Sequence, residues 1–101
     1  MFSLEKVSQT ELMLVVSGSL YGEAGAEFEK RLESLVETEY STITLNLSMA
    51  LGITSAAIGK LLGVRKRLAE QNKKIRIQGC NETLYQTFKK IKLDTIMEIT
   101  Q

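Results

Sequence analysis

The sequence predicts an α/β fold, with a mostly parallel sheet of four to five strands, one antiparallel edge strand and flanking helices. Short apolar runs typical of strands alternate with longer segments whose apolar residues recur at helical spacing. Strands separated by helices need crossover connections, which make neighbouring strands parallel. The chain contains no proline, repeat or low-complexity stretch. We therefore expect residues 1–101 to form a single domain without a linker.

The first part of the chain predicts a hairpin and then a helix. Residues 3–7 and 11–18 suit two strands joined by a polar Ser-Gln-Thr turn, and the second strand is apolar enough to lie inside a sheet. Residues 23–39 suit an amphipathic helix that packs through one face. The apolar residues of that face are Phe28, Leu32, Leu35 and Val36.

The rest of the chain alternates strand and helix. Residues 41–48 have apolar and polar side chains in alternation, which predicts a third strand. Helical spacing follows over 54–71, a fourth strand over 74–79, and a third helix over 81–91 that begins at an asparagine suited to be its N-cap. Residues 95–100 are expected to form a short final strand.

Composition limits the classes of partner. The chain has thirteen Lys and Arg and twelve Asp and Glu, which gives a net charge of +1. No overall electrostatic field therefore favours binding to nucleic acid or to a membrane surface. No run of about 18 apolar residues is present, so no membrane span is expected. The lone Cys80 and the absence of a secretory pattern at the start predict a cytoplasmic protein.

The residues for the common catalytic and metal chemistries are missing. The chain has no histidine, which removes the most frequent general base and metal ligand. Cys80 follows a predicted strand and is expected to be a small buried apolar residue. The glycines of the stretch Gly-Glu-Ala-Gly-Ala-Glu-Phe lack the spacing of a phosphate-binding loop. We therefore expect no catalytic residues, no metal, no cofactor and no enzymatic activity.

The helix predicted over 54–71 carries a stripe with almost no side chain. Ser55, Gly59 and Gly63 are one turn apart on one face. Each interior glycine costs about 0.8–1.0 kcal/mol relative to alanine, so two of them need a reason. Either the helix packs closely on its own sheet through these glycines, or a partner approaches them. The expected core face is Ile58, Leu61, Leu62 and Leu68, with Lys60, Lys66 and Arg67 in water.

Two adjacent hydroxyls open the same helix. Either Thr54 or Ser55 is expected to cap the free amides of the first turn, and one cap is enough. The other hydroxyl lies at the positive end of the helix dipole. It is therefore well placed for phosphorylation, because the added charge of about −1.5 to −2 meets favourable amides and dipole there.

The stretch over 42–79, TITLNLSMALGITSAAIGKLLGVRKRLAEQNKKIRIQG, resembles the STAS domains of bacterial anti-sigma factor antagonists. In that family the pattern is approximately Leu-Asp-Leu-Ser, a short loop, Asp-Ser-Ser-Gly-Leu-Gly and a long helix. Ser55 corresponds to the serine that is phosphorylated, and Ser48 and Gly59 match the pattern. The departures are Asn46 and Thr54 in place of the two aspartates, Ala56 in place of the second serine and Ala57 in place of the first glycine.

The resemblance implies a regulatory protein-binding module. In the family, a serine kinase that doubles as an anti-sigma factor phosphorylates the antagonist, a phosphatase reverses this, and the unphosphorylated form binds the kinase to release the sigma factor. The resemblance implies Ser55 as the phosphoacceptor, with Thr54 as second choice. The expected partner-binding residues are Thr54, Ser55, Ala56, Gly59, Lys60 and Gly63. We expect a monomer or weak dimer.

Two other functions stay open at this point. Some family members never switch, and instead dock on a transport ATPase or form part of a stress-signalling scaffold. A small enzyme that uses Thr54 or Ser55 as nucleophile is the third possibility, and it is disfavoured because no base is evident nearby in the sequence.

Overall fold

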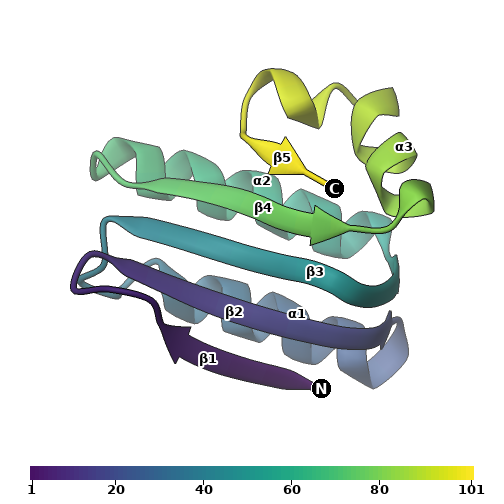
Figure 1. Cartoon of the computed structure of the whole chain (residues 1–101), viewed down its shortest axis with the longest axis horizontal. Coiled ribbons are helices and arrows are strands. Elements are labelled where there is room, and N and C mark those ends of the chain that lie inside the picture. Colours follow the sequence, from purple (N-terminus) through teal and green to yellow (C-terminus); the bar gives the residue numbers. More distant parts are fainter.

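A computed structural model describes all residues, 1–101. Five strands form one sheet in the order β1-β2-β3-β4-β5, in which β1 and β2 are antiparallel and all other neighbours are parallel (Figure 1). This confirms the predicted fold class. The elements are β1 Phe2–Lys6, β2 Glu11–Leu20, α1 Gly22–Leu35, β3 Thr42–Ile53, α2 Ser55–Glu70, β4 Lys74–Cys80, α3 Glu82–Lys90, the 3-10 helix η1 Leu93–Thr95 and β5 Ile99–Thr100.

Two predicted strands have bounds that differ from the structure by four residues or more, and the other three differ by one or two. The third strand does not end at residue 48 but continues to Ile53. The last strand is reduced to Ile99–Thr100, because the preceding residues form η1 instead. In η1 the amides of Ile96 and Met97 donate to the carbonyl of Leu93, and this turn buries the side chains of Leu93 and Met97 together. Burial of two apolar side chains thus outweighs local strand preference.

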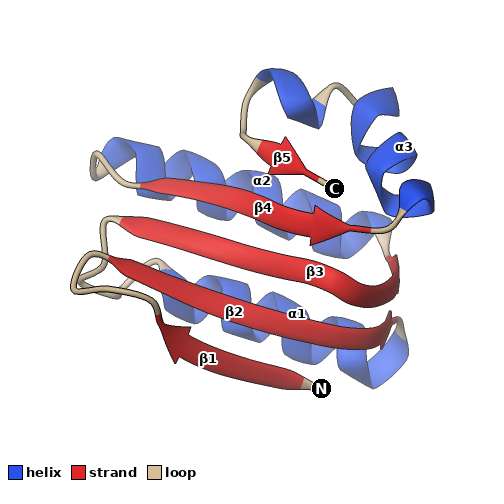
Figure 2. Cartoon of the chain, viewed as in Figure 1, coloured by secondary structure: helices blue, strands red, loops and turns tan.

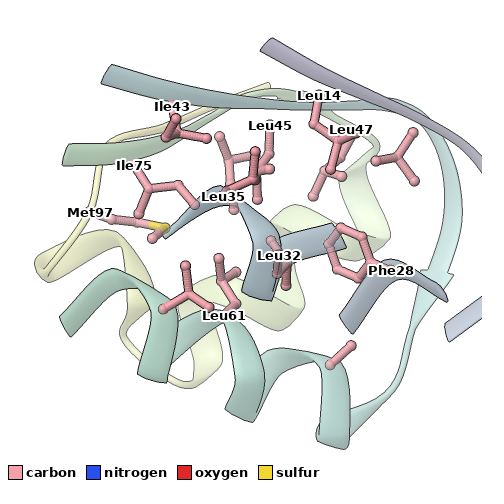
Figure 3. Packing of buried hydrophobic residues seen from close by; sticks show 14 of the residues in the cluster. Leu14, Phe28, Leu32, Leu35, Ile43, Leu45, Leu47, Leu61, Ile75 and Met97 are labelled. Carbon is pink, nitrogen blue, oxygen red and sulfur yellow. The ribbon is translucent and has the colours of Figure 1, made fainter. Parts of the chain in front are cut away.

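Helices α1 and α2 cover one face of the sheet, and no helix covers the opposite face of β2, β3 and β4 (Figure 2). Alternate residues of the central strands β2, β3 and β4 point to the helices and are buried, as the period of two requires. Figure 3 shows several of these side chains against α1 and α2. The core includes Leu12, Leu14, Val16, Ile43, Leu45, Leu47, Ile75 and Ile77 from the strands and Phe28, Leu32, Leu35, Leu61 and Leu68 from the helices.

The buried face of α2 is rotated slightly from the predicted one. Leu61 and Leu68 are fully buried, as expected, but the other central positions are Ala57 and Val64. Leu62 was expected in the core and is 37% exposed, so that prediction is wrong. Ile58 is only partly buried at the edge of the core. The small side chain of Ala57 lets the helix approach the sheet with this face rather than with Ile58 and Leu62 central.

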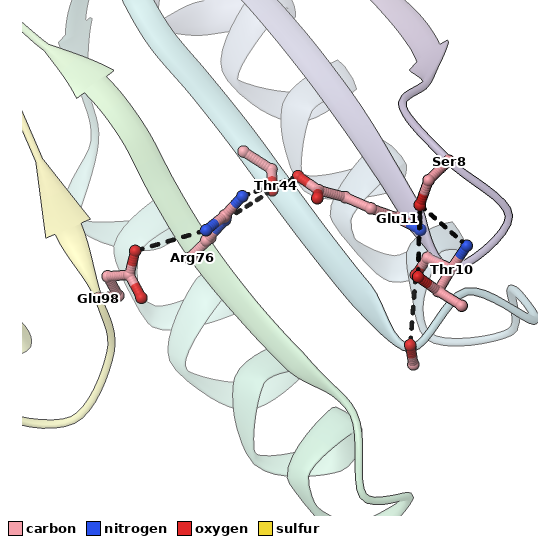
Figure 4. A network of polar contacts seen from close by, with 7 residues as sticks. Ser8, Thr10, Glu11, Thr44, Arg76 and Glu98 are labelled. Carbon is pink, nitrogen blue, oxygen red and sulfur yellow. Dashed lines mark hydrogen bonds and ion pairs between the residues drawn. The ribbon is translucent and has the colours of Figure 1, made fainter.

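The uncovered face of the sheet carries a polar network that crosses the strands (Figure 4). The Thr44 hydroxyl donates to Glu11 Oε2 at 2.7 Å and accepts from Arg76 Nε at 3.0 Å. Arg76 Nη2 also donates to Glu11 Oε2 at 3.0 Å, and Nη1 lies 3.5 Å from Glu98 Oε2. Thr44 is fully buried beneath these side chains and is fully hydrogen-bonded, which offsets the cost of burying its hydroxyl. The network links β2, β3 and β4 with the residues before β5.

This network predicts a specific acid sensitivity. The Thr44 hydroxyl and then the Arg76 guanidinium stabilise the Glu11 carboxylate and lower its pKa. A lowered pKa in the folded state gives stability that is present above the unfolded pKa, about 4.3, and lost as pH falls through the folded value. The urea concentration at the midpoint of unfolding should fall between about pH 6 and about pH 3, and it should fall less in Glu11→Gln than in wild type. Thr44→Val should reduce this decrease in part. A decrease in Glu11→Gln equal to that of wild type would contradict the assignment.

Candidate functional site

The strand that leads to the candidate site is irregular at its end. Val15 pairs with Asn46 and Ser17 with Met49, so β3 holds one extra residue there relative to β2. A second extra residue follows, because Gly18 pairs with Ala50 but Ser19 pairs with Gly52. Such bulges bend a strand and increase its twist, and the far end of β3 is visibly curved (Figure 1). The curved end delivers the chain to Thr54.

Thr54 is the N-cap of α2. Its backbone is extended, with φ −88° and ψ 159°, and its Oγ1 accepts a hydrogen bond from the amide of Ala57 at 3.0 Å. This confirms that one hydroxyl of the pair caps the helix. Ser55 is the first helical residue, is exposed, and its hydroxyl makes no hydrogen bond within the chain. The pair therefore has divided roles: Thr54 stabilises the helix, and the hydroxyl of Ser55 is free for chemistry or binding.

The start of α2 is electrostatically positive. The amides of Ser55 and Ala56 have no acceptor within the chain, and the first turn contains no acidic side chain. Unpaired amides and the helix dipole together favour an anion at this position. Ala56 is exposed beside Ser55 and adds no bulk or charge.

The glycine stripe faces away from the protein. Gly59 and Gly63 are exposed, and a Cβ added at either would meet no heavy atom within 4 Å. The alternative in which these glycines pack on the protein's own sheet is therefore wrong. Ser55, Gly59 and Gly63 instead form a smooth, accessible strip along α2, which we call the glycine strip.

Lys60 differs from its expected position in water. It is only half exposed, and its Nζ lies 3.4 Å from Glu33 Oε2 of α1. Glu33 also pairs with Arg67, which is about two turns further along α2. The Arg67 contact first, and then that of Lys60, lowers the pKa of Glu33. Lys60 thus helps to tie α2 to α1, although it still borders the glycine strip. Lys66 and Arg67 are exposed as expected.

The two other positions that match the family pattern have a local role. Asn46 Oδ1 accepts hydrogen bonds from the amide and the hydroxyl of Ser48, at 3.1 and 2.7 Å. These bonds lie at the first bulge of β3 and stabilise its shape. Neither residue is hydrogen-bonded to Thr54 or Ser55.

The start of α1 adjoins the site, which the sequence analysis did not anticipate. A Cβ on Gly25 would lie 2.8 Å from the carbonyl oxygen of Leu20 and 4.0 Å from the methyl of Thr54. A Cβ on Gly52 would lie 2.7 Å from the ring of Tyr21, so the ring rests on the backbone of β3. Gly25 permits close approach between α1 and the end of β2, and Gly52 permits close approach between Tyr21 and the end of β3. Gly25, a glycine inside a predicted helix, was the only hint in the sequence.

Exposed apolar side chains surround this end of the sheet. Tyr21, Met49 and Leu51 are 55%, 65% and 70% exposed. The bulges in β3 account for Met49 and Leu51, because an extra residue shifts side chains from the buried to the exposed face. Large apolar residues exposed together are typical of surfaces that bind other proteins.

Other chemistry has little support in the side chains. Cys80 is buried, and burial raises the pKa of its thiol, which disfavours the nucleophilic thiolate. No three side chains of the types that bind metals come together. None of the helices has the combination of length and hydrophobicity that crossing a bilayer requires.

The geometry defines a class of protein: a small α/β module with a mixed five-stranded sheet, whose prominent surface feature is a helix start with a free serine. The sequence agrees with the family model of the STAS domain over residues 2–101. The chain therefore belongs to the STAS domain family.

Solved structures share this fold. SpoIIAA of Bacillus, an anti-sigma factor antagonist, matches in its unphosphorylated form with a TM-score of 0.82 and 19% identity over 100% of this chain and 89% of that one, and a phosphorylated form is also similar. An anti-sigma factor antagonist of Mycobacterium paratuberculosis matches with a TM-score of 0.85 and 13% identity, over 98% of this chain and 83% of that one. The STAS domain of a SulP transporter from Vibrio cholerae matches with a TM-score of 0.68 and 15% identity, over 93% of this chain and 75% of that one. No curated protein matches the sequence.

Proposed function

We propose that this chain is a bacterial anti-sigma factor antagonist, a non-catalytic protein-binding module of the cytoplasm. In this proposal the form with unphosphorylated Ser55 binds a serine kinase that doubles as an anti-sigma factor, and a phosphatase restores that form. The observation that carries the proposal is the free, exposed hydroxyl of Ser55 beside the open glycine strip. SpoIIAA, which shares the fold, has been solved in both unphosphorylated and phosphorylated forms.

The local geometry suits a phosphate on Ser55 without loss of the fold. The amides of Ser55 and Ala56 have no acceptor within the chain, so they are free to donate hydrogen bonds to a phosphate oxygen. The Thr54 cap already satisfies the amide of Ala57 and does not compete. A charge of about −1.5 to −2 would then be held at the start of the glycine strip. A partner that docks there would have to remove water from this charge, which opposes binding. Phosphorylation therefore changes binding rather than stability.

Thr54 is the weaker candidate for the phosphoacceptor. Its Oγ1 is occupied as the acceptor of the cap and its side chain is half-buried. A phosphate there would disturb the cap, which is worth about 1 kcal/mol.

The second candidate function is a STAS module that regulates a transport ATPase or a stress-signalling scaffold without a phosphorylation switch. Two observations favour it. Thr54 stands where the family motif has an aspartate, and the fold is shared with the STAS domain of a SulP transporter. Both functions use the same surface and differ in the partner and in the modification of Ser55.

A capture experiment separates the two functions. The purified chain, immobilised through its C-terminus, is incubated with lysate from the native cell, and bound proteins are identified by mass spectrometry. A serine kinase of the GHKL type supports the antagonist, and an ABC-type ATPase supports the alternative. Incubation of the captured kinase with ATP should add one phosphate to wild type and none to Ser55→Ala. Transfer to the Ser55→Ala variant would exclude Ser55 and point to Thr54.

Variants of Ser55 should change affinity for the captured partner without changing the fold. Ser55→Asp introduces one negative charge, less than a phosphate carries, and is expected to weaken binding about tenfold. Ser55→Ala should bind as tightly as the unphosphorylated protein, and a kinase should not be able to release it. Ser3→Asp, at an exposed serine of the edge strand β1, is the control for added charge. Equal affinities for wild type, Ser55→Asp and Ser55→Ala would remove Ser55 from the interface.

A further inference from the structure

A cationic pocket lies at the far end of α2 from Ser55. It has a volume of about 230 Å³ and lies between the second half of α2, the start of β4 and the residues before β5. Its floor is apolar, formed by Ala69, Ile75 and Met97 with Ile96 beside them. Four cations line it, Arg65, Lys73, Lys74 and Arg76, with Glu98 as the single carboxylate. At a rise of about 1.5 Å per residue, Arg65 is about 15 Å along the helix from Ser55.

Most of this positive charge is not compensated within the protein. Arg76 is paired with Glu11 and Glu98. No carboxylate lies within ion-pair distance of the other three cations of the pocket. Arg65 Nε donates to the carbonyl of Ile96 at 2.9 Å, which leaves its two terminal nitrogens free, and Lys73 Nζ donates to the carbonyl of Thr38. Since the whole chain has a net charge of only +1, this concentration of cations is local.

The backbone adds a donor at the same place. β5 pairs with β4 only at Ile77 and Gln78, so the upstream edge of β4 has no strand beside it. The amide of Ile77 donates to Glu98 on this side, and that of Lys74 donates to Ser41 on the other. Because amides alternate along a strand, the amide of Ile75 faces the pocket edge, where no strand accepts it.

We propose that this pocket binds a small organic anion, a phosphate or carboxylate group carried on a compact apolar body. The guanidinium of Arg65 and the ammonium of Lys74 would receive the anionic group, because charge-assisted hydrogen bonds to such groups are strong. The floor of Ala69, Ile75 and Met97 would receive the apolar part. The volume is below the roughly 300–1,000 Å³ of pockets for drug-sized ligands, so the ligand is small. This site is separate from the partner-binding surface proposed at Ser55.

The pocket suits a small molecule better than an added peptide strand. The segment that closes the open edge of β4 is fixed by two bonds, from Arg65 to Ile96 and from the amide of Ile77 to Glu98. A peptide that extended the sheet along β4 would have to displace this segment. A ligand of a few atoms would not.

Heteronuclear NMR titration of the whole chain with phenyl phosphate, benzoate and inorganic phosphate tests the proposal. We expect saturable shifts confined to residues 65–76 and 96–98 with phenyl phosphate. Inorganic phosphate should bind at least about tenfold more weakly, because it leaves the apolar floor uncovered. Binding of benzoate as well would support a general organic anion site, and binding of phenyl phosphate alone would restrict it to phosphorylated ligands. Shifts spread over lysines of the whole surface, or equal affinity for inorganic phosphate, would overturn the proposal.

Four variants locate the site. Lys74→Gln, at an exposed residue, and Arg65→Gln should each weaken phenyl phosphate binding about tenfold. Lys66→Gln removes an exposed charge beside Arg65 that does not line the pocket, and it should bind as wild type. Ser55→Ala should also bind as wild type, so this test does not depend on the partner switch. Lys74→Gln keeps the test valid if Arg65→Gln disturbs the segment at Ile96. Equal weakening by Lys66→Gln would contradict the assigned site.

Discussion

Leu61→Ala is expected to lower the free energy of unfolding by about 2–5 kcal/mol, whereas Leu62→Ala should lower it by less than about 1 kcal/mol. Leu61 is fully buried between α2 and the sheet, so its truncation removes buried apolar atoms and leaves a cavity (Figure 3). Leu62 is 37% exposed at the border of that face. A domain of this size has a total stability of about 5–15 kcal/mol, so Leu61→Ala should approach the limit of folding.

Urea unfolding followed by circular dichroism measures both variants, and the adjacent leucines are matched in chemistry and helix propensity. Equal destabilisation would mean that the helix is rotated toward the phase predicted from the sequence, with Leu62 in the core. The glycine strip would then not face solvent as described. Should Leu61→Ala fail to fold, Leu61→Val provides a smaller truncation with the same expected order.

Gly59→Leu should abolish most partner binding while the protein melts at or above the wild-type temperature. A side chain at this position meets no atom of the protein, and loss of a helical glycine stabilises a helix by up to about 1 kcal/mol. In the complex, the same side chain would project from the glycine strip into the partner. We expect an affinity loss of about thirtyfold, or about 2 kcal/mol, as for a central interface position.

Gly25→Leu is the matched control, because it also places leucine at a glycine in a helix. There an added Cβ would lie 2.8 Å from a backbone carbonyl oxygen, which cannot move aside cheaply. This variant should lose at least about 1–3 kcal/mol of stability. Thermal melts and affinity for the captured partner are measured for both. A Gly59→Leu protein that melts well below wild type would place Gly59 against the protein itself. One that binds normally would exclude the glycine strip as the docking surface.

Local sequence patterns determined the elements and the character of the helix start. Periods of two and of about 3.6 located the central strands and helices, because side-chain direction follows backbone geometry. A cap by either Thr54 or Ser55, and the cap at Asn81, whose side chain accepts from Leu84, were predictable because capping involves residues three apart. The structure decided that Thr54 is the cap. The resemblance of residues 42–79 to the STAS pattern identified the family and drew attention to Ser55.

Tertiary contacts decided what neighbouring residues do not encode. The rotation of α2, which exposes Leu62 and buries Val64, depends on how closely Ala57 lets the helix approach the sheet. The two bulges in β3 are visible only against β2, and they expose Met49 and Leu51 near the site. The sequence alone could not relate such positions, since their register and packing depend on residues far apart in the chain.

The cationic pocket and the Glu11–Thr44–Arg76 network have the same origin. Their members come from separate strands and from α2, and they meet only when the parallel sheet aligns β2, β3 and β4. In the sequence their charged and polar members are ordinary residues, and nothing sets apart the apolar residues that line the pocket. Electrostatic interactions depend on distances in space, which the sequence does not give. Only the folded structure therefore decides which of these charges are paired and which are not.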